Sequence, residues 1–296
     1  TQVPEGVTSL ESFILTELPV EATHAAGTYH LRYEGAGEIE IFNGSNLRYA
    51  DKHITFDYVP NGRGLVGINI LETDPEGTGN HIRDITVVHE DNLQAHAAGE
   101  IFNPDWVKLI DDVHALRFMD WMNTNDSEVS SWAEVTQVAD HTYVPGAPVE
   151  IMVALANQTG TEPWFTLPYH ADSDYVETFA RYVRDALDPP LRAHYELSNE
   201  VWNWQFEQAH QSHADAIARF GEELSDGWVQ NYAAKAAEMA ATLDAVYAGY
   251  EARLVKVIST QTGWLGLENS ILEAPAWQEM GHAAPYKSFD TYAITG

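Results

Sequence analysis

The chain has 296 residues, 45% of them hydrophobic, which is enough for one large core or two smaller ones. Its 45 Asp and Glu residues against 15 Lys and Arg residues give a formal net charge of −30, and such a surface repels nucleic-acid phosphates and anionic lipids. With no cysteine it has no disulfide, thiolate nucleophile or iron–sulfur cluster. No apolar run approaches the ~20 residues of a membrane helix. We therefore expect neither a nucleic acid nor a membrane as a partner.

The first part of the chain alternates apolar and polar residues. Ile54, Phe56 and Tyr58 form one such run, which ends at Pro60. Further runs of the same kind lie between residue 23 and residue 92, separated by Gly, Pro and Asn. Period-two alternation between turn residues is typical of short antiparallel strands. We predict an antiparallel β-sandwich-like segment within a first domain of residues 1–95.

The second part, residues 96–296, alternates strands with helices. Helices are expected from Pro104, from Pro148 to Gly160, after Asp172, and over residues 228–250. Strands are expected at 116–121, 164–168, 194–199, 254–259 and 289–294. This alternation is typical of a parallel barrel or a doubly wound sheet.

Function in parallel sheets belongs at the carboxyl ends of the strands. Polar and aromatic residues gather just after the predicted strands: Asp120, Trp121, Asn123, Tyr169, His170, Asn199, Glu200, Trp202 and Gln261. Trp164 and Trp204 are further aromatic candidates. His210 and His213 have a spacing that could ligate a metal, but with no carboxylate partner in the motif we assign them to a solvated helix face.

The segment from Tyr195 to Asn203 reads Tyr-Glu-Leu-Ser-Asn-Glu-Val-Trp-Asn. A carboxylate beside a carboxamide, with indoles nearby, is suited to holding a sugar and protonating it. Together with the earlier phrase Leu-Arg-Phe-Met-Asp-Trp at 116–121, it resembles the (β/α)8 clan of retaining glycoside hydrolases that includes cellulases and β-mannanases. Within the clan it is similar to a little-characterised bacterial group with a β-sandwich segment inserted near the start of the barrel.

The resemblance covers roughly residues 25–296 and implies an α/β fold with a (β/α)8-type (TIM-like) barrel. By this resemblance Glu200 is the general acid/base, Asn199 contacts the sugar 2-hydroxyl, and Arg117 supports the nucleophile. The clan's nucleophile is a second Glu at the end of strand seven. The five predicted strands correspond to strands two to six, so strands one, seven and eight are not matched. The chain is then either an internal piece of a longer protein or a reduced fold, and we expect an incomplete barrel.

Three functions follow as hypotheses. The first is hydrolysis of a β-linked polysaccharide or oligosaccharide. The second is hydrolysis of an ester or lactone, in which the activated water is bound either by Asp, Glu and His side chains alone or by these together with calcium. The third is carbohydrate binding without turnover. The expected catalytic residues are Glu200, Asn199 and His170, and the expected substrate-binding residues are Arg117, Asp120, Trp121, Tyr169, Trp202, Trp204 and Gln261.

No dedicated metal site and no cofactor is predicted. An open barrel would expose apolar strand edges, which favours self-association or capping of those edges. A secreted or periplasmic location is favoured over a cytoplasmic one.

Overall fold

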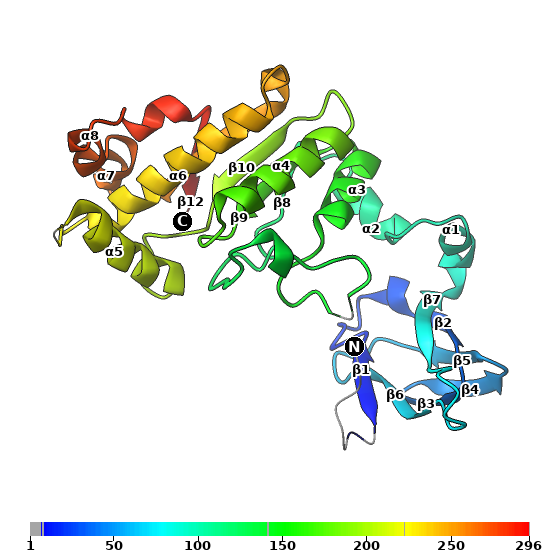
Figure 1. Ribbon diagram of the computed structural model, residues 1–296. Coiled ribbons are helices and arrows are strands. Elements are labelled where there is room, and N and C mark those ends of the chain that lie inside the picture. The colour runs from blue at the N-terminus through cyan, green and yellow to red at the C-terminus, as the bar shows by residue number, and fades with distance from the viewer. Residues whose placement is uncertain (1–6, 8, 141, 222, 296) are drawn as a thin grey trace. The chain divides into compact units, whose positions relative to one another are not determined.

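The computed structural model describes residues 7, 9–140, 142–221 and 223–295. The chain divides into two compact units, Thr1–Trp106 and Val107–Gly296 (Figure 1). The boundary falls within the short helix α2 (Pro104–Ile110).

Two antiparallel sheets build the first unit. One has the order β1-β6-β3, with β1 (Leu10–Ile14), β6 (Val66–Thr73) and β3 (Gly37–Phe42). The other has the order β4-β5-β2-β7, with β4 (Ser45–Ala50), β5 (His53–Tyr58), β2 (Gly27–Glu34) and β7 (Arg83–His89). Short helical segments flank them at Thr23–Ala25, Glu90–Asn92 and α1 (Leu93–Ala97).

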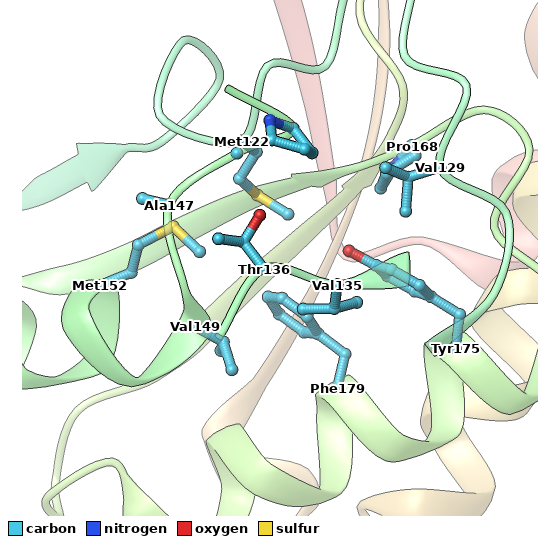
Figure 2. A pocket seen from close by; sticks show the side chains of 12 residues that line it. Met122, Val129, Val135, Thr136, Ala147, Val149, Met152, Pro168, Tyr175 and Phe179 are labelled. Carbon is cyan, nitrogen blue, oxygen red and sulfur yellow. The ribbon is translucent and has the colours of Figure 1, made fainter. Parts of the chain in front are cut away.

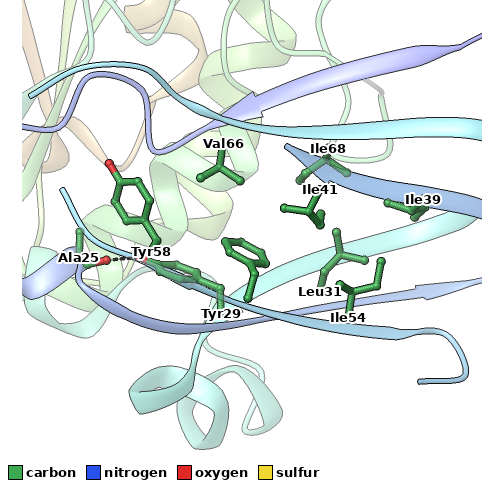
Figure 3. Packing of buried hydrophobic residues seen from close by; sticks show 10 residues of the cluster. Ala25, Tyr29, Leu31, Ile39, Ile41, Ile54, Tyr58, Val66 and Ile68 are labelled. Atoms are coloured by element: carbon green, nitrogen blue, oxygen red, sulfur yellow. Dashed lines mark hydrogen bonds between the residues drawn. The ribbon is translucent and has the colours of Figure 1, made fainter. Parts of the chain in front are cut away.

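Residues from both sheets form the core of this unit (Figure 3). Leu31 of β2, Ile41 of β3 and Phe56 of β5 are buried there, because alternate residues of a strand face the same side. The Tyr29 hydroxyl donates to the Ala25 carbonyl oxygen at 2.9 Å, so this buried phenol is satisfied. The apolar alternation in the sequence therefore builds the core of the first unit.

The second unit contains one parallel sheet of order β12-β11-β10-β9-β8. The strands are β8 (Ala115–Arg117), β9 (Glu162–Leu167), β10 (Ala193–Leu197), β11 (Leu254–Gln261) and β12 (Thr291–Thr295). Between them run α3 (Val149–Thr159), α4 (Ser173–Ala186), α5 (Glu207–Phe220), α6 (Gly227–Val246), α7 (Leu267–Leu272) and α8 (Pro275–Glu279), with single turns at Trp132–Glu134, Glu251–Arg253 and Pro285–Ser288. Each strand after β8 pairs in parallel with the one that precedes it in the chain.

Local chemistry explains where these helices begin and end. The Asp172 carboxylate accepts from the Tyr175 backbone N–H at 2.7 Å and caps α4. Gly160 ends α3 in the left-handed conformation, with φ of 67°. Helix α6 is buried along most of its length, which its alanines permit because small side chains allow close packing.

The prediction of an incomplete (β/α)8-type, TIM-like barrel behind an N-terminal β-sandwich is wrong. The parallel sheet has five strands, and β8 and β12 are its outer strands. The other strands in the described part of the chain belong to the two antiparallel sheets of the first unit, so none of them continues the parallel sheet. Pairing in chain order is common to a barrel and an open sheet, and strand–helix alternation does not distinguish them.

Across the described residues, no helix is both long enough and apolar enough to cross a bilayer.

An ion-pair cluster fixes the start of β9 and gives a test of this unit's stability. Glu162 accepts from Arg192 Nε at 2.8 Å and contacts His194 Nε2 at 2.7 Å. Burial acts to raise the pKa of Glu162, but the hydrogen bonds from Arg192 and His194 outweigh it and hold the pKa below its ordinary value. The carboxylate therefore stabilises the fold above its unfolded-state pKa, and that stability is lost as pH falls through the lowered pKa.

We expect Glu162→Gln to lower the free energy of unfolding by about 1.5–3 kcal/mol at pH 7, measured by urea unfolding. The difference from wild type should shrink toward pH 3. Glu177→Gln, which removes an exposed pair with Arg181, is the control and should cost about 0–1 kcal/mol. A deficit in Glu162→Gln that stays constant down to pH 3 would contradict the account.

Candidate functional site

The chain takes an unusual backbone path directly after β10. Ser198 and Glu200 both lie in the left-handed region, with φ of 58° and 43°. Such a conformation costs a non-glycine residue about 1–3 kcal/mol, so the surroundings must hold it. The Ser198 N–H donates to the Leu167 carbonyl oxygen at 2.7 Å, which extends the ladder one residue beyond the strand. Asn199 is then buried, while Glu200 is only partly buried.

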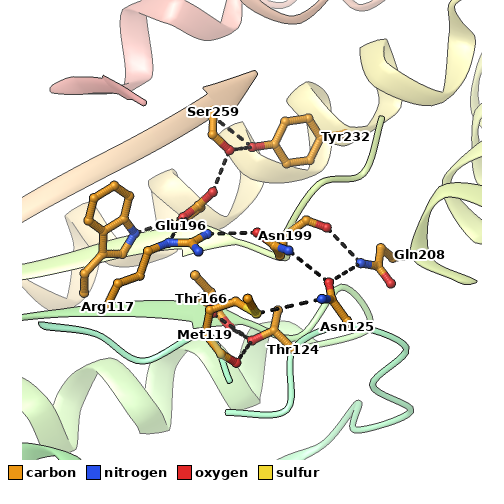
Figure 4. A network of polar contacts seen from close by, with 11 residues as sticks. Arg117, Met119, Thr124, Asn125, Thr166, Glu196, Asn199, Gln208, Tyr232 and Ser259 are labelled. Atoms are coloured by element: carbon orange, nitrogen blue, oxygen red, sulfur yellow. Dashed lines mark hydrogen bonds and ion pairs between the residues drawn. The ribbon is translucent and has the colours of Figure 1, made fainter. Parts of the chain in front are cut away.

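The centre of the site is a buried carboxylate on β10 (Figure 4). Glu196 is 1% exposed, and its Oε2 accepts from Arg117 Nη2 at 2.9 Å. The Trp164 Nε1–H donates to the same oxygen at 2.9 Å, and the Ser259 hydroxyl donates to Oε1 at 2.6 Å. Arg117, Trp164 and Ser259 come from β8, β9 and β11. A buried charge needs a counter-charge and full hydrogen bonding, and Glu196 has both.

Tyr232 of α6 extends this network through Ser259 of β11. Ser259 gives its single hydroxyl hydrogen to Glu196, so the Tyr232 hydroxyl, 3.2 Å from the Ser259 oxygen, is the donor to it. Burial raises the pKa of Tyr232, so the phenol stays protonated at neutral pH.

The same arginine positions the asparagine before Glu200. Arg117 Nη2 donates to Asn199 Oδ1 at 3.0 Å, and Asn199 Nδ2 donates to Asn125 Oδ1 at 3.0 Å. Gln208 of α5 donates to the Asn199 carbonyl oxygen at 2.8 Å and to Asn125 Oδ1 at 3.0 Å. The amide of Asn199 therefore has a fixed orientation, and one Nδ2 hydrogen remains for another acceptor.

Glu200 lines an open pocket of about 690 Å³. Its Oε2 accepts from Asn203 Nδ2 at 2.9 Å, which fixes the carboxyl group at the pocket wall. The pocket is lined by Glu200, Trp202, Asn203, Trp204, Gln205, Gln261, Gly263 and Trp264. These residues follow β10 or end and follow β11, so two adjacent strands build the pocket at their carboxyl ends.

The predicted site residues separate into groups. Glu200, Trp202, Trp204 and Gln261 share the pocket, although Trp202 is 4% exposed and contributes little surface. Arg117, Asn199 and Trp164 belong to the buried network beside it, so Trp164 holds Glu196 there.

The remaining predicted site residues lie outside the pocket. The Tyr169 hydroxyl is buried and donates to Asp215 at 2.9 Å, and burial raises the pKa of this phenol. His170 packs edge-on against the Tyr169 ring at 5.4 Å. Asp120 is exposed in the turn after β8, and Trp121 packs on Phe118 at 5.5 Å. The pocket lining includes none of these four residues. The exposed Asn123 is also absent from it.

Some functional positions were not predicted from the sequence. Trp264 follows β11 by three residues, and the rule that selected Trp202 after β10 would have found it. Glu196 had a signal of a different kind, since a carboxylate between Tyr195 and Leu197 in an apolar strand must be paired. Asn125 and Gln208 lie in a loop and a helix far apart in sequence, and no local pattern joins them.

A second hollow lies between the loop after β8 and helices α3 and α4 (Figure 2). Its free volume of about 20 Å³ has room for little more than one water molecule, and Met122, Met152 and Phe179 contribute to its mainly apolar lining. We assign it to core packing. In the ranges covered by the structure, no group of three or more His, Asp or Glu side chains has an arrangement that could hold a metal ion.

Comparison of the chain with protein-family models, with curated proteins and with solved structures found no match.

The central ion pair can be tested by removing one partner at a time. Arg117→Met should lower the free energy of unfolding by about 3–5 kcal/mol, because it leaves the Glu196 carboxylate buried without a cation. Adding Glu196→Gln should recover part of this loss, since no charge is then buried. Urea unfolding of the single and double variants provides the comparison. A double variant less stable than Arg117→Met alone would contradict the assignment.

Proposed function

We propose that this protein hydrolyses a glycosidic bond in a β-linked polysaccharide or oligosaccharide, with Glu200 as the proton donor. The observation that carries the proposal is the position of Glu200. Its carboxyl group lies at a strand end, in the wall of an open pocket that also presents indole rings and carboxamides. The resemblance of the Tyr195–Asn203 segment to the acid/base strand of retaining glycosidases supports the same role.

In the proposed reaction, Glu200 gives a proton to the glycosidic oxygen as the bond between that oxygen and the anomeric carbon breaks. The leaving sugar departs as an alcohol. Water adds its hydroxyl to the anomeric carbon, and its remaining proton restores Glu200. Asn203 holds the carboxyl group through Oε2 while the proton moves.

Asn199 positions the chain segment that carries this carboxyl group, because it is buried and is not among the residues that line the pocket. Its oxygen is committed to Arg117, and one of its amide hydrogens is committed to Asn125.

A second candidate is carbohydrate binding without turnover. Both retaining and inverting glycosidases use a pair of carboxyl groups across the scissile bond. Glu200 is the single carboxylate among the described residues that line the pocket. The missing second carboxylate in the lining favours binding without turnover as the alternative. Absence of turnover on every glycoside would then select it.

Leaving-group dependence tests the role of Glu200 directly. Glu200→Gln should lower kcat/KM for unsubstituted oligosaccharides by about 100- to 10,000-fold, because a sugar alkoxide leaves only when protonated. Dinitrophenyl glycosides, whose leaving group departs as a stable anion, should lose far less.

Glu207→Gln, an exposed carboxylate on α5, is the matched control and should match wild type on both substrates. Equal losses on the two substrates would exclude proton donation by Glu200. Turnover of aryl esters or lactones, with no glycoside cleaved, would replace the proposal with hydrolysis of a different C–O bond.

A further inference from the structure

Two indoles in the pocket lining, Trp204 and Trp264, share a third indole, Trp228, as a buried neighbour. Trp204 follows β10, Trp264 follows β11, and Trp228 lies between them at the start of α6. The ring centres of Trp204 and Trp228 are 5.0 Å apart, and those of Trp228 and Trp264 are 6.1 Å apart. Trp228 is buried, whereas Trp204 is 41% exposed and Trp264 is 45% exposed. Two large apolar rings are thus presented to solvent on a shared buried support.

Contacts behind Trp204 hold it in place. His210 and His213 of α5 pack against its ring, with centres 5.2 Å and 5.7 Å away. His210 Nε2 also donates to the Trp204 carbonyl oxygen at 3.0 Å. Aromatic side chains fixed in the wall of a pocket are common in ligand-binding sites. Exposed apolar surface that binds no ligand promotes aggregation.

Gln261 supplies an independent observation that points to a ligand. Its Oε1 is buried, and no hydrogen-bond partner for it exists in the described part of the chain. A buried acceptor left unpaired costs about 1–3 kcal/mol. A Cβ at Gly263 would lie 3.1 Å from this oxygen, so glycine leaves space beside it. Gln261 and Gly263 both line the pocket, and a rotation of the Gln261 carboxamide toward it would let a bound hydroxyl satisfy the acceptor.

We propose that Trp204, Trp264 and Gln261 form a subsite that binds a neutral sugar ring next to the bond that Glu200 protonates. The inference rests on the proposed function for the nature of the ligand. A pyranose ring with equatorial hydroxyls presents a flat C–H face, which packs on an indole, and a rim of hydroxyls, which bond to carboxamides. Asn203, Gln205 and Gln261 supply those carboxamides.

The lining selects against charged sugars. Among the described residues around the pocket there is no Lys or Arg, and the chain has a formal net charge of −30. A uronate ring would find no cation in the lining to offset its charge, in a chain whose net charge is negative. The subsite therefore binds neutral rings and excludes polyuronates.

Titration calorimetry in the Glu200→Gln background tests the subsite without turnover. The probes are cellohexaose and mannohexaose as neutral oligosaccharides and a hexamer of galacturonate as the anionic one. We expect one of the neutral probes to bind and the galacturonate hexamer not to bind. Trp204→Ala and Trp264→Ala should each raise Kd by roughly tenfold or more, and Gln261→Leu by roughly fivefold, through loss of stacking and of the acceptor.

Tyr49→Ala, which removes an exposed aromatic residue on β4 of the other unit, is the matched control and should leave Kd unchanged. Trp204→Phe and Trp264→Phe keep an aromatic ring and should retain most of the affinity, which separates stacking from misfolding.

The outcomes separate this inference from the proposed function. Binding that depends on both indoles, in a protein that turns over no glycoside, would support the subsite and overturn the hydrolysis proposal. Glycoside turnover that depends on Glu200, with Kd and KM unchanged in Trp204→Ala and Trp264→Ala, would overturn the subsite and leave hydrolysis standing. Absence of both binding and turnover would overturn both, and galacturonate binding would overturn the neutral-sugar assignment.

Discussion

The carboxylate of Glu196 joins four neighbouring strands of the parallel sheet. It lies on β10 and receives hydrogen bonds from Arg117 on β8, Trp164 on β9 and Ser259 on β11. A charge this deeply buried costs several kcal/mol in lost hydration, and only complete pairing offsets it. The arrangement therefore ties four segments, distant in sequence, to one spatial register.

Positioning of the site follows from that constraint. Arg117 bonds to both Glu196 and Asn199, so one guanidinium fixes the buried charge and the residue before Glu200 together. Ser198 and Glu200 then turn in the left-handed region, a cost that a rigid network can bear. The two neighbouring side chains, Asn199 and Glu200, therefore point into different surroundings at the end of β10. Asn199 bonds to Arg117 of β8 and to Asn125 in the loop after β8, while Glu200 lines a pocket whose indoles follow β10 and β11.

Local sequence patterns predicted much of this structure, because periodicity and caps act over a few residues. The parallel strands, the Asp172 cap of α4 and the polar clusters at strand ends all depend on neighbours in the chain. Barrel closure depends on which strands meet at the two outer edges, and the predicted barrel was wrong for that reason. The pairing of Glu196 with Arg117, 79 residues apart, and the approach of Asn125 to Gln208 depend on tertiary contacts that no local pattern contains. Tyr169 and His170 follow a strand as Glu200 does, yet Tyr169 turns inward to Asp215.

The central claim is that Glu200 acts on a sugar held against the exposed indoles. A crystal structure of the Glu200→Gln protein soaked with a neutral β-linked oligosaccharide tests it most directly. The account predicts a sugar ring packed on Trp204 or Trp264, with a glycosidic oxygen within hydrogen-bond distance of the side chain at position 200. An oligosaccharide bound elsewhere, or one whose glycosidic oxygens all lie beyond reach of that side chain, would contradict it.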